Sequence, residues 1–349
     1  MSSYLYSMTN RQSANAVAAM KIASNGSIKF VKGSPFPTGG KGFRATESQN
    51  AVWAEKDFVF AVDGGSDSFA VFRRNPDGTL VGMNSNPVPS QGARPYSVCF
   101  SNGILYVLNR GNPDAGTPPS LAVFAVEDGN ARHLAKNRIE FGVGETPTQV
   151  IANKQGTLLA VPSAGPDGSL LYCYRIDAGG AASSGLLTKL EDSPFSISGG
   201  DLGFGSAWTS DGKTLFMTNA LGDASVVRLS IDAKSGRITE KARVKAAGTA
   251  CWAGLGNGEK KLYVTNGASV LVYELAPDAI TEIQSEDVTD MPSPVVHDLV
   301  LGPKAKFLYV IDQRNRRILF YSIGANGRVK RKGELAMAAP SFPLGLAIG

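Results

Sequence analysis

The sequence has few of the side chains that metal-binding and disulfide-linked proteins need. Its 349 residues include 2 histidines and 3 cysteines, and no two cysteines stand at CxxC spacing. These counts argue against a zinc site and against a disulfide framework. Cys99, Cys173 and Cys251 each lie inside an apolar, strand-like run and are expected to be buried, unreactive thiols. We expect neither a metal nor a cofactor.

Long apolar runs are missing as well. No segment approaches 18 consecutive apolar residues, so no membrane-spanning helix is expected. The start, "MSSYLYSMTN", lacks the basic region and apolar core of a signal peptide, and the cytoplasm is therefore the expected location.

The formal net charge is +5, and the densest basic run contains Arg314, Arg316, Arg317 and residues 328–332. Because this run lacks interleaved aromatics, we expect a solvated outer strand, with neither nucleic acid nor membrane as a partner.

What the chain does contain is one hairpin, repeated. It reads "KKLYVTNGASVLVYEL" at residues 260–275 and recurs as "FVFAVDGGSDSFAVFR", "TLFMTNALGDASVVRL" and "FLYVIDQRNRRILFYSI". The strand equivalent to "LYVTN" ends, at intervals of 46 to 57 residues, at Asn10, Asp63, Asn109, Pro162, Asn219, Asn266 and Asp312. Each unit has four strand signals and turns such as "NPDGTL" and "TSDGKT". This pattern predicts an all-β, seven-bladed β-propeller of four-stranded antiparallel blades.

The two chain ends are expected to complete the ring. The first unit begins without its leading strand, and the tail "SFPLGLAIG" looks like the inner strands "RPYSVCFS" and "SPVVHDLVLG". We predict that this tail pairs with "YLYSMTN" in the first blade, which removes two free sheet edges. The connectors "GSPFPTGG" and "DSPFSISGG" would each leave an outer strand for the next blade. Residues 1–349 then form a single domain, and a monomer is expected because a closed ring has no need to oligomerise.

These hairpins, with their "YVTN" cores and "DG" turns, resemble the lactonase-like seven-bladed propeller family. That family includes bacterial 6-phosphogluconolactonases and fungal carboxy-muconate cyclases. The combination of "SQNAV", "RPYSV", "TACW" and "PLGLAIG" is most similar to the branch labelled 3-carboxymuconate cyclase-like. The resemblance covers essentially the whole chain.

The family typically places one histidine, two arginines and one glutamate in the central channel. Where the histidine is expected, this chain has Thr146 and Thr148 in "TPTQV", and it reads "GDLGFGS" in place of the first arginine motif. Ala220 stands at the glutamate position and Gly267 at the second arginine position. The resemblance thus implies the fold, while neither known reaction transfers residue by residue.

A small-molecule site in a propeller normally lies at the mouth of the central channel. Inner-strand starts converge there with the loops between the second and third strands. The strand starts nominate Gln49, Arg94, Tyr96, Gln149, Cys251, Trp252, His297 and Asp298. The loops nominate Arg11, Asp63, Asn109, Arg110, Asn219, Asn266, Asp312 and Arg314.

Among these residues we assign catalytic roles to Arg94, His297 and Asp298. Arg94 can hold a carboxylate or polarise a lactone carbonyl, and it stays charged at any working pH. His297 and Asp298 are the only adjacent histidine–acid pair, although neighbours on a strand point to opposite faces. Each of the three also has a purely structural reading. Expected substrate-binding residues are Gln49, Tyr96, Asn109, Arg110, Gln149 and Trp252.

Two features of the sequence allow a second structural interpretation. The insertion "GNPDAGTPPS" after Arg110 is either a lid or surface slack. Trp252 and Phe204 are also suited to fill the wedge between neighbouring blades.

The sequence therefore favours a cofactor-independent lactonase or cycloisomerase, that is, a lactone hydrolase or an intramolecular lyase or isomerase. Its partner would be a small anionic or lactone substrate in the central channel. One alternative is a catalytically silent propeller that binds a ligand or protein. The other is a relative repurposed for a different cyclisation or isomerisation in secondary metabolism.

Overall fold

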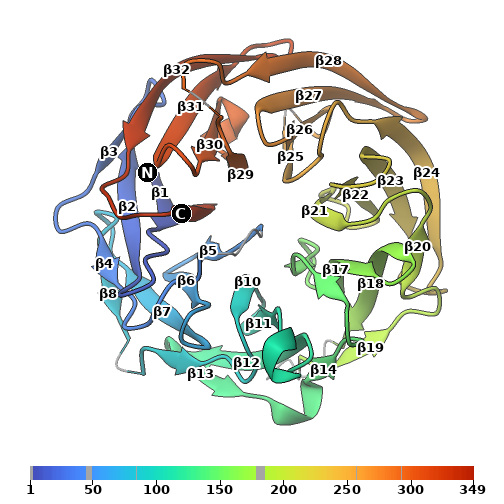
Figure 1. Ribbon diagram of the computed structural model, residues 1–349, viewed down its shortest axis with the longest axis horizontal. Helices are drawn as coiled ribbons and strands as arrows, with labels where there is room; N and C mark the ends of the chain where they lie inside the picture. The colour runs from blue at the N-terminus through green and yellow to red at the C-terminus, as the bar shows by residue number, and fades with distance from the viewer. Residues whose placement is uncertain (1–2, 45–48, 84, 178–184, 257, 292) are drawn as a thin grey trace.

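The computed structural model describes residues 3–44, 49–83, 85–177, 185–256, 258–291 and 293–349. In these residues, seven antiparallel sheets stand around one axis (Figure 1). The predicted all-β, seven-bladed propeller is confirmed. No helix in the described ranges is long and apolar enough to cross a bilayer.

In each of the first four blades, a short extra strand pairs with the third strand from the axis. Blade 1 is β33 (Leu344–Ile348), β1 (Tyr4–Met8), β2 (Ala16–Ile22) and β3 (Ile28–Phe30), with β4 (Phe36–Pro37) on β2. Blade 2 is β5 (Val52–Glu55), β6 (Phe58–Asp63), β7 (Ser68–Arg74) and β8 (Leu80–Gly82), with β9 (Val88–Pro89) on β7. Blade 3 is β10 (Pro95–Ser101), β11 (Ile104–Asn109), β12 (Ser120–Glu127) and β13 (Asn130–His133), with β14 (Ile139–Glu140) on β12. Blade 4 is β15 (Thr146–Pro147) with β16 (Ile151–Ala152), then β17 (Leu158–Gly165), β18 (Gly168–Ile176) and β19 (Leu187–Lys189), with β20 (Phe195–Ile197) on β18.

The last three blades have four strands each, in the same order from the axis outward. Blade 5 is β21 (Gly203–Trp208), β22 (Thr214–Asn219), β23 (Ser225–Ile231) and β24 (Ile238–Lys245). Blade 6 is β25 (Ala253–Gly256), β26 (Lys261–Thr265), β27 (Ser269–Ala276) and β28 (Ala279–Asp287). Blade 7 is β29 (Val296–Leu301), β30 (Phe307–Asp312), β31 (Arg317–Ile323) and β32 (Val329–Ala336). Three single-turn 3₁₀ helices lie in the connections: η1 (Pro113–Ala115), η2 (Ala135–Asn137) and η3 (Pro303–Ala305).

Burial explains why the repeated hairpin is almost uniformly apolar. The second strand of a blade packs against neighbouring blades on both of its faces, and all five residues of β26 are buried. The outermost strand is covered on only one of its two faces, so β32 alternates between covered and exposed residues. A strand covered on both faces reads as a continuous apolar run, whereas a half-covered strand alternates.

The C-terminal strand closes the ring as predicted. β33 pairs with β1 in antiparallel register, with Leu5 opposite Ile348 and Tyr6 opposite Ala347. The main chains of Tyr4 and Gly349 exchange two further hydrogen bonds of 3.0 Å. Both ends of the chain therefore lie in blade 1 (Figure 1).

The connectors depart from the prediction in one detail. Segments within "GSPFPTGG" and "DSPFSISGG" form β4 and β20, which still pair with the third strand of the blade they leave. The outer edge of these blades is therefore an interrupted strand, and only the residues after it cross to the next blade.

Polar side chains tie the inner strands of neighbouring blades together, and one of them reaches across the axis. The amide of Gln49 donates to the carbonyl of Ala253 over 2.8 Å, and so reaches from the start of blade 2 to blade 6. Ser97 donates to the carbonyl of Gln49 over 2.8 Å and accepts from the amide of Val150 at 3.0 Å. Gln149 accepts two hydrogen bonds of 2.7 Å from Ser206. These bonds satisfy buried polar groups where seven strands converge.

Candidate functional site

Two adjoining pockets lie on the face where inner strands begin and second strands end. Their volumes are about 350 and 390 Å³. Both are lined by Arg44, Arg316 and Phe342, so we treat them as one site, the arginine groove. The remaining lining residues are Val295, Gln313 and Arg314 in one pocket, and Asn10, Arg11, Gln12, Ser13, Pro340 and Ser341 in the other.

Four arginines from three parts of the chain reach this groove. Arg11 follows β1, Arg44 lies in the connector from blade 1 to blade 2, and Arg314 and Arg316 lie in the turn between β30 and β31. The guanidinium of Arg44 sits 5.2 Å from the ring centre of Phe342, in a cation–π contact. Arg11 donates at 3.4 Å to the carbonyl of Ala338, which ties it to the last connector.

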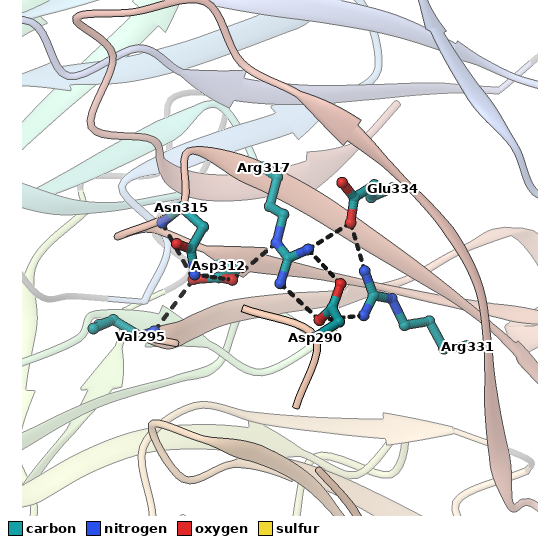
Figure 2. A network of polar contacts seen from close by, with 7 residues as sticks. All are labelled: Asp290, Val295, Asp312, Asn315, Arg317, Arg331 and Glu334. Carbon is teal, nitrogen blue, oxygen red and sulfur yellow. Dashed lines mark hydrogen bonds and ion pairs between the residues drawn. The ribbon is translucent and has the colours of Figure 1, made fainter. Parts of the chain in front are cut away.

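An ionic network centred on the buried pair Asp312 and Arg317 holds the turn that carries Arg314 and Arg316 (Figure 2). Asp312, which ends β30, accepts from Asn315 at 2.8 Å and from Nε of Arg317 at 2.9 Å. Arg317 also bonds Asp290 at 2.8 Å and Glu334 at 2.6 Å. The turn is therefore anchored at both ends, and its two exposed arginines project from a fixed base.

This network corrects the prediction that the basic run is solvated throughout. Arg317 is buried, because three carboxylates surround its guanidinium. Arg328 and Lys330, near the start of the outer strand β32, are exposed as expected. The run is thus divided among the arginine groove, an internal ion network and the solvated edge.

Among the lining residues that the structure describes, the ionised side chains are all positively charged, and none is an aspartate, glutamate or histidine. Four guanidinium groups with few nearby counter-charges make a site for an anion, and arginine can bind a carboxylate or phosphate through two parallel hydrogen bonds. The same groups can stabilise negative charge as it develops on a carbonyl oxygen.

Arg94 lies beside the groove rather than in its lining. Its guanidinium is 4.9 Å from the ring centre of Phe43, the residue before Arg44, and 3.5 Å from the carboxylate of Asp114. Its backbone adopts a positive φ of 56°, and its amide donates to Asp67 at 2.7 Å. Asp114 belongs to η1, so the insertion after Arg110 folds back onto Arg94.

His297 and Asp298 are both buried and face different neighbours. The imidazole of His297 lies 4.7 Å from the ring centre of Trp252, and its Nδ1 has no hydrogen-bond partner among the described residues. Asp298 accepts from the amides of Leu299 at 2.8 Å and Leu346 at 2.9 Å, which ties blade 7 to β33. Burial raises the pKa of Asp298 to about 8, against the effect of its two amide donors.

The acid stability of the protein tests the environment of His297. Burial lowers the pKa of His297 to about 4, from an ordinary value of 6.5. Between these values the unfolded chain binds a proton that the folded chain does not, so this group destabilises the fold as the pH falls from about 6.5 to about 4. His297→Phe retains an aromatic contact and removes the titration. We expect the variant's free energy of unfolding to fall about 2–3 kcal/mol less than the wild type's between about pH 7 and about pH 4.5.

Urea denaturation across that pH range measures the effect. Burial raises the pKa of Asp63 to about 6 and that of Asp298 to about 8, so these two groups act on stability in the opposite direction as the pH falls. Both are present in the wild type and in the variant. The difference between the two pH profiles therefore isolates His297. Parallel profiles would contradict the assigned environment.

The six residues predicted to bind substrate lie outside the arginine groove. Tyr96, Asn109 and Trp252 are buried, and Trp252 packs 4.8 Å from the ring centre of Phe204, as its structural reading predicted. Gln49 is engaged in the hydrogen bond across the axis, and Gln149 in hydrogen bonds to Ser206 of the neighbouring blade. Arg110 is half-buried, and its amide donates to the carbonyl of Arg94 at 3.0 Å. Arg94, Gln149 and Asp298 are not among the described residues that line the arginine groove, and the roles of all nine predicted site residues stay predictions.

Sequence reasoning missed two of the three residues that the groove's pockets share. Arg11 and Arg314 were indicated by their loops, and Arg316 was noticed only as part of a basic run. Arg44 and Phe342 carried no signal in the repeat, because both lie in connectors of irregular length. Their pairing joins residues almost 300 positions apart in the chain.

A family model described as "Lactonase, 7-bladed beta-propeller" matches residues 206–343, which is less than half of the chain. No protein of curated function matches the sequence. The family match confirms the resemblance that the repeats predicted.

Solved structures share the whole ring. A Bacteroides fragilis protein provisionally assigned as a 6-phosphogluconolactonase is 18% identical, with a TM-score of 0.76, over 100% of this chain and 98% of that one. A periplasmic gluconolactonase from Pseudomonas aeruginosa is 16% identical, with a TM-score of 0.76, over 99% and 98%. A functionally unknown Desulfotomaculum acetoxidans protein is 14% identical, with a TM-score of 0.72, over 100% and 99%. At these identities the likeness is one of fold.

Proposed function

We propose, from the premise that this chain is a lactonase-like seven-bladed propeller, that it is a cofactor-independent lactonase or cycloisomerase. Its substrate would be a small carboxylated or lactone molecule held in the arginine groove. The observation that carries the proposal is the set of four arginines, Arg11, Arg44, Arg314 and Arg316, around two adjoining pockets whose described lining residues include no acidic side chain. A cytoplasmic location and a monomeric state remain predictions.

The chemistry follows from what guanidinium groups can do. Arg44 and Arg316, common to both pockets, are placed to hold a carboxylate of the substrate and fix its position. A neighbouring guanidinium can then stabilise the oxyanion that forms when water adds to a lactone carbonyl. The attacking water loses one proton to bulk water, the ring C–O bond breaks as the carbonyl re-forms, and the leaving alkoxide takes a proton from water. Closure of a hydroxy acid is the same sequence in reverse. In a cycloisomerisation, a substrate carboxylate adds instead to a carbon–carbon double bond, and the adjacent carbon takes a proton from water, so the product is an isomer of the substrate.

A second function is favoured by a specific observation. The part of the groove lining that the structure describes contains no carboxylate or imidazole that could transfer a proton, and proton transfer by a positioned side chain typically contributes 10²–10⁴-fold to an enzyme's rate. A propeller that binds an anionic ligand without converting it needs only the arginines. The two functions share a ligand site and differ in turnover.

The test combines turnover with binding. Sugar lactones, aromatic-derived lactones and carboxy-muconates are incubated with the protein in excess EDTA, and products are followed by mass spectrometry. For any substrate converted, we expect the Arg44→Ala/Arg316→Ala double variant to lose about 100-fold or more in kcat/KM. The matched control is Arg328→Ala, which removes an exposed arginine from the turn before the outer strand of the same blade. Arg94→Ala tests the arginine beside the groove.

The possible outcomes distinguish the enzyme from the binding propeller. Metal-independent turnover that falls in the double variant and not in the control supports the enzyme. Turnover that the double variant retains places the chemistry elsewhere and overturns the groove. No turnover, with calorimetric binding of the same compounds that requires Arg316, establishes the binding propeller instead.

A further inference from the structure

A third pocket lies at the opposite mouth of the central channel. It has a volume of about 430 Å³ and is lined by the ends of five inner strands, from blades 2 to 6. The arginine groove is lined by inner-strand starts and by the loops that follow second strands. Because inner strands run in the same direction around a propeller, the ends of these strands meet at the other face. Nothing in the proposed function uses this pocket.

Two tryptophans line this pocket from different blades. Trp53 lies on β5 in blade 2 and Trp208 on β21 in blade 5, and both are half-buried. Trp53 and Glu55 are two positions apart on β5 and therefore lie on the same face of that strand, as Ser206 and Trp208 do on β21, and all four residues line the pocket. The remaining tryptophan, Trp252, is fully buried between blades.

Both indoles of the pocket are fixed in orientation. The Nε1 of Trp53 donates to Glu55 Oε2 at 3.3 Å, and the Nε1 of Trp208 donates to the carbonyl of Ile151 at 3.3 Å. Part of each ring packs against hydrophobic residues of the neighbouring blades, so with the N–H groups also engaged, each tryptophan offers a ligand the remaining exposed part of its aromatic surface. Surfaces held in place before binding lose little conformational entropy when a ligand arrives.

The floor of the pocket separates it from the groove. Gln49 and Ala253 both line the pocket, and the hydrogen bond of 2.8 Å between them crosses the channel axis. Ser206, also in the lining, is engaged by Gln149. A ligand in the pocket therefore lies against a polar floor formed by side chains that already tie the blades together.

The polar residues of the pocket balance in charge. Glu55 and Lys154 are the ionised side chains among the lining residues that the structure describes, and Ser101 and Asn102 add a hydroxyl and an amide. One carboxylate and one ammonium favour a ligand without net charge, while together these groups offer both hydrogen-bond donors and acceptors. Two aromatic faces call for a ligand with a flat apolar side.

We propose that this pocket binds a neutral polyhydroxylated ring, of the class of a sugar, stacked on the faces of Trp53 and Trp208. The C–H face of such a ring contacts an indole, and its hydroxyl groups meet the mixed polar set formed by Glu55, Ser101, Asn102 and Lys154. The site is independent of the arginine groove, so either proposal can fail without the other.

The three tryptophans provide the measurement. Two of them line the pocket and the third is shielded from solvent, so a ligand there changes the emission of Trp53 and Trp208. The intact protein is titrated with D-glucose and cellobiose, and with choline and gluconate as cationic and anionic comparators. We expect saturable binding of a neutral sugar in the millimolar range, with the charged comparators weaker.

Variants locate the binding by ligand-observed NMR, which does not depend on the fluorophore removed. Trp208→Ala is expected to weaken sugar binding at least about tenfold, and Trp208→Phe to weaken it less, because an aromatic face remains. Glu55→Ala, a surface change at the end of β5, keeps the test possible if Trp208→Ala fails to fold. Arg316→Ala, on the opposite face, is the control and should bind sugar normally.

Three results would overturn the proposal. The first is no saturable response to either sugar. The second is binding that Trp208→Ala and Glu55→Ala both leave unchanged. The third is a preference for choline over the sugars, which would make the pocket a site for organic cations.

Discussion

A chain that ends at Pro343, and therefore lacks β33, is expected to lose the cooperative unfolding of the ring. Leu344 and Leu346 are buried, and each contributes about 1.5–3 kcal/mol through the apolar surface it removes from water. The truncation also leaves one edge of β1 unpaired and removes the amide of Leu346 from the buried carboxyl of Asp298. Together these losses approach the 5–15 kcal/mol by which folded domains are ordinarily stable.

Size-exclusion chromatography and urea denaturation measure this effect. The truncated chain should aggregate through its free edge or unfold in a broad transition. A chain lacking only Gly349 is the matched control, because it loses the two main-chain bonds to Tyr4 and keeps the buried leucines. A synthetic peptide of residues 341–349 should restore the wild-type elution volume to the truncated chain. A truncated chain that unfolds like the wild type would show that β33 does not hold the ring closed.

Arg317→Ala is expected to lower the free energy of unfolding by about 3–5 kcal/mol, the usual result of removing one partner from a buried ion pair. The Arg317 side chain is 4% exposed, and Asp312 beside it is 0% exposed. Without the guanidinium, the Asp312 carboxylate keeps Asn315 and the amide of Val295 as donors but loses its counter-charge (Figure 2). Asp290 and Glu334 are partly exposed, so solvent can compensate for their loss of this partner.

Urea denaturation at neutral pH provides the measurement, because urea leaves ion pairs unscreened. Arg328→Ala, which removes an exposed arginine from the same blade, should change stability by no more than about 0.5 kcal/mol. Arg317→Lys should fall between the two, since it keeps the charge and loses the planar fork that engages three carboxylates. If Arg317→Ala is as stable as the control, the network does not anchor the turn that carries Arg314 and Arg316.

The repeat and the closure were predictable because they depend on local pattern. A second strand such as β26 is covered on both faces, so its burial is recorded in nearly every residue it contains. The tail "SFPLGLAIG" resembled other inner strands because β33 occupies an equivalent place in blade 1. The same local logic placed Phe204 and Trp252 between blades.

The candidate site was only partly predictable. Loops after second strands pointed to Arg11 and Arg314, since every such loop reaches the same face. Nothing local distinguished Arg317, which is buried among carboxylates, from Arg316, which lines the groove one position earlier. Side chains at successive positions point in opposite directions, so Arg316 and Arg317 meet different surroundings. Those surroundings are formed by segments that lie far away in the sequence.

The sequence by itself determined the number of blades, the order of their strands and the join between the two chain ends. Those features follow from hydrophobic periodicity, which each repeat carries within its own residues. Only the tertiary structure decided that Arg44 would lie over Phe342, that Gln49 would cross the axis, and that Trp53 and Trp208 would line one pocket. These contacts join different blades, and closing the ring brings their partners together regardless of distance along the chain.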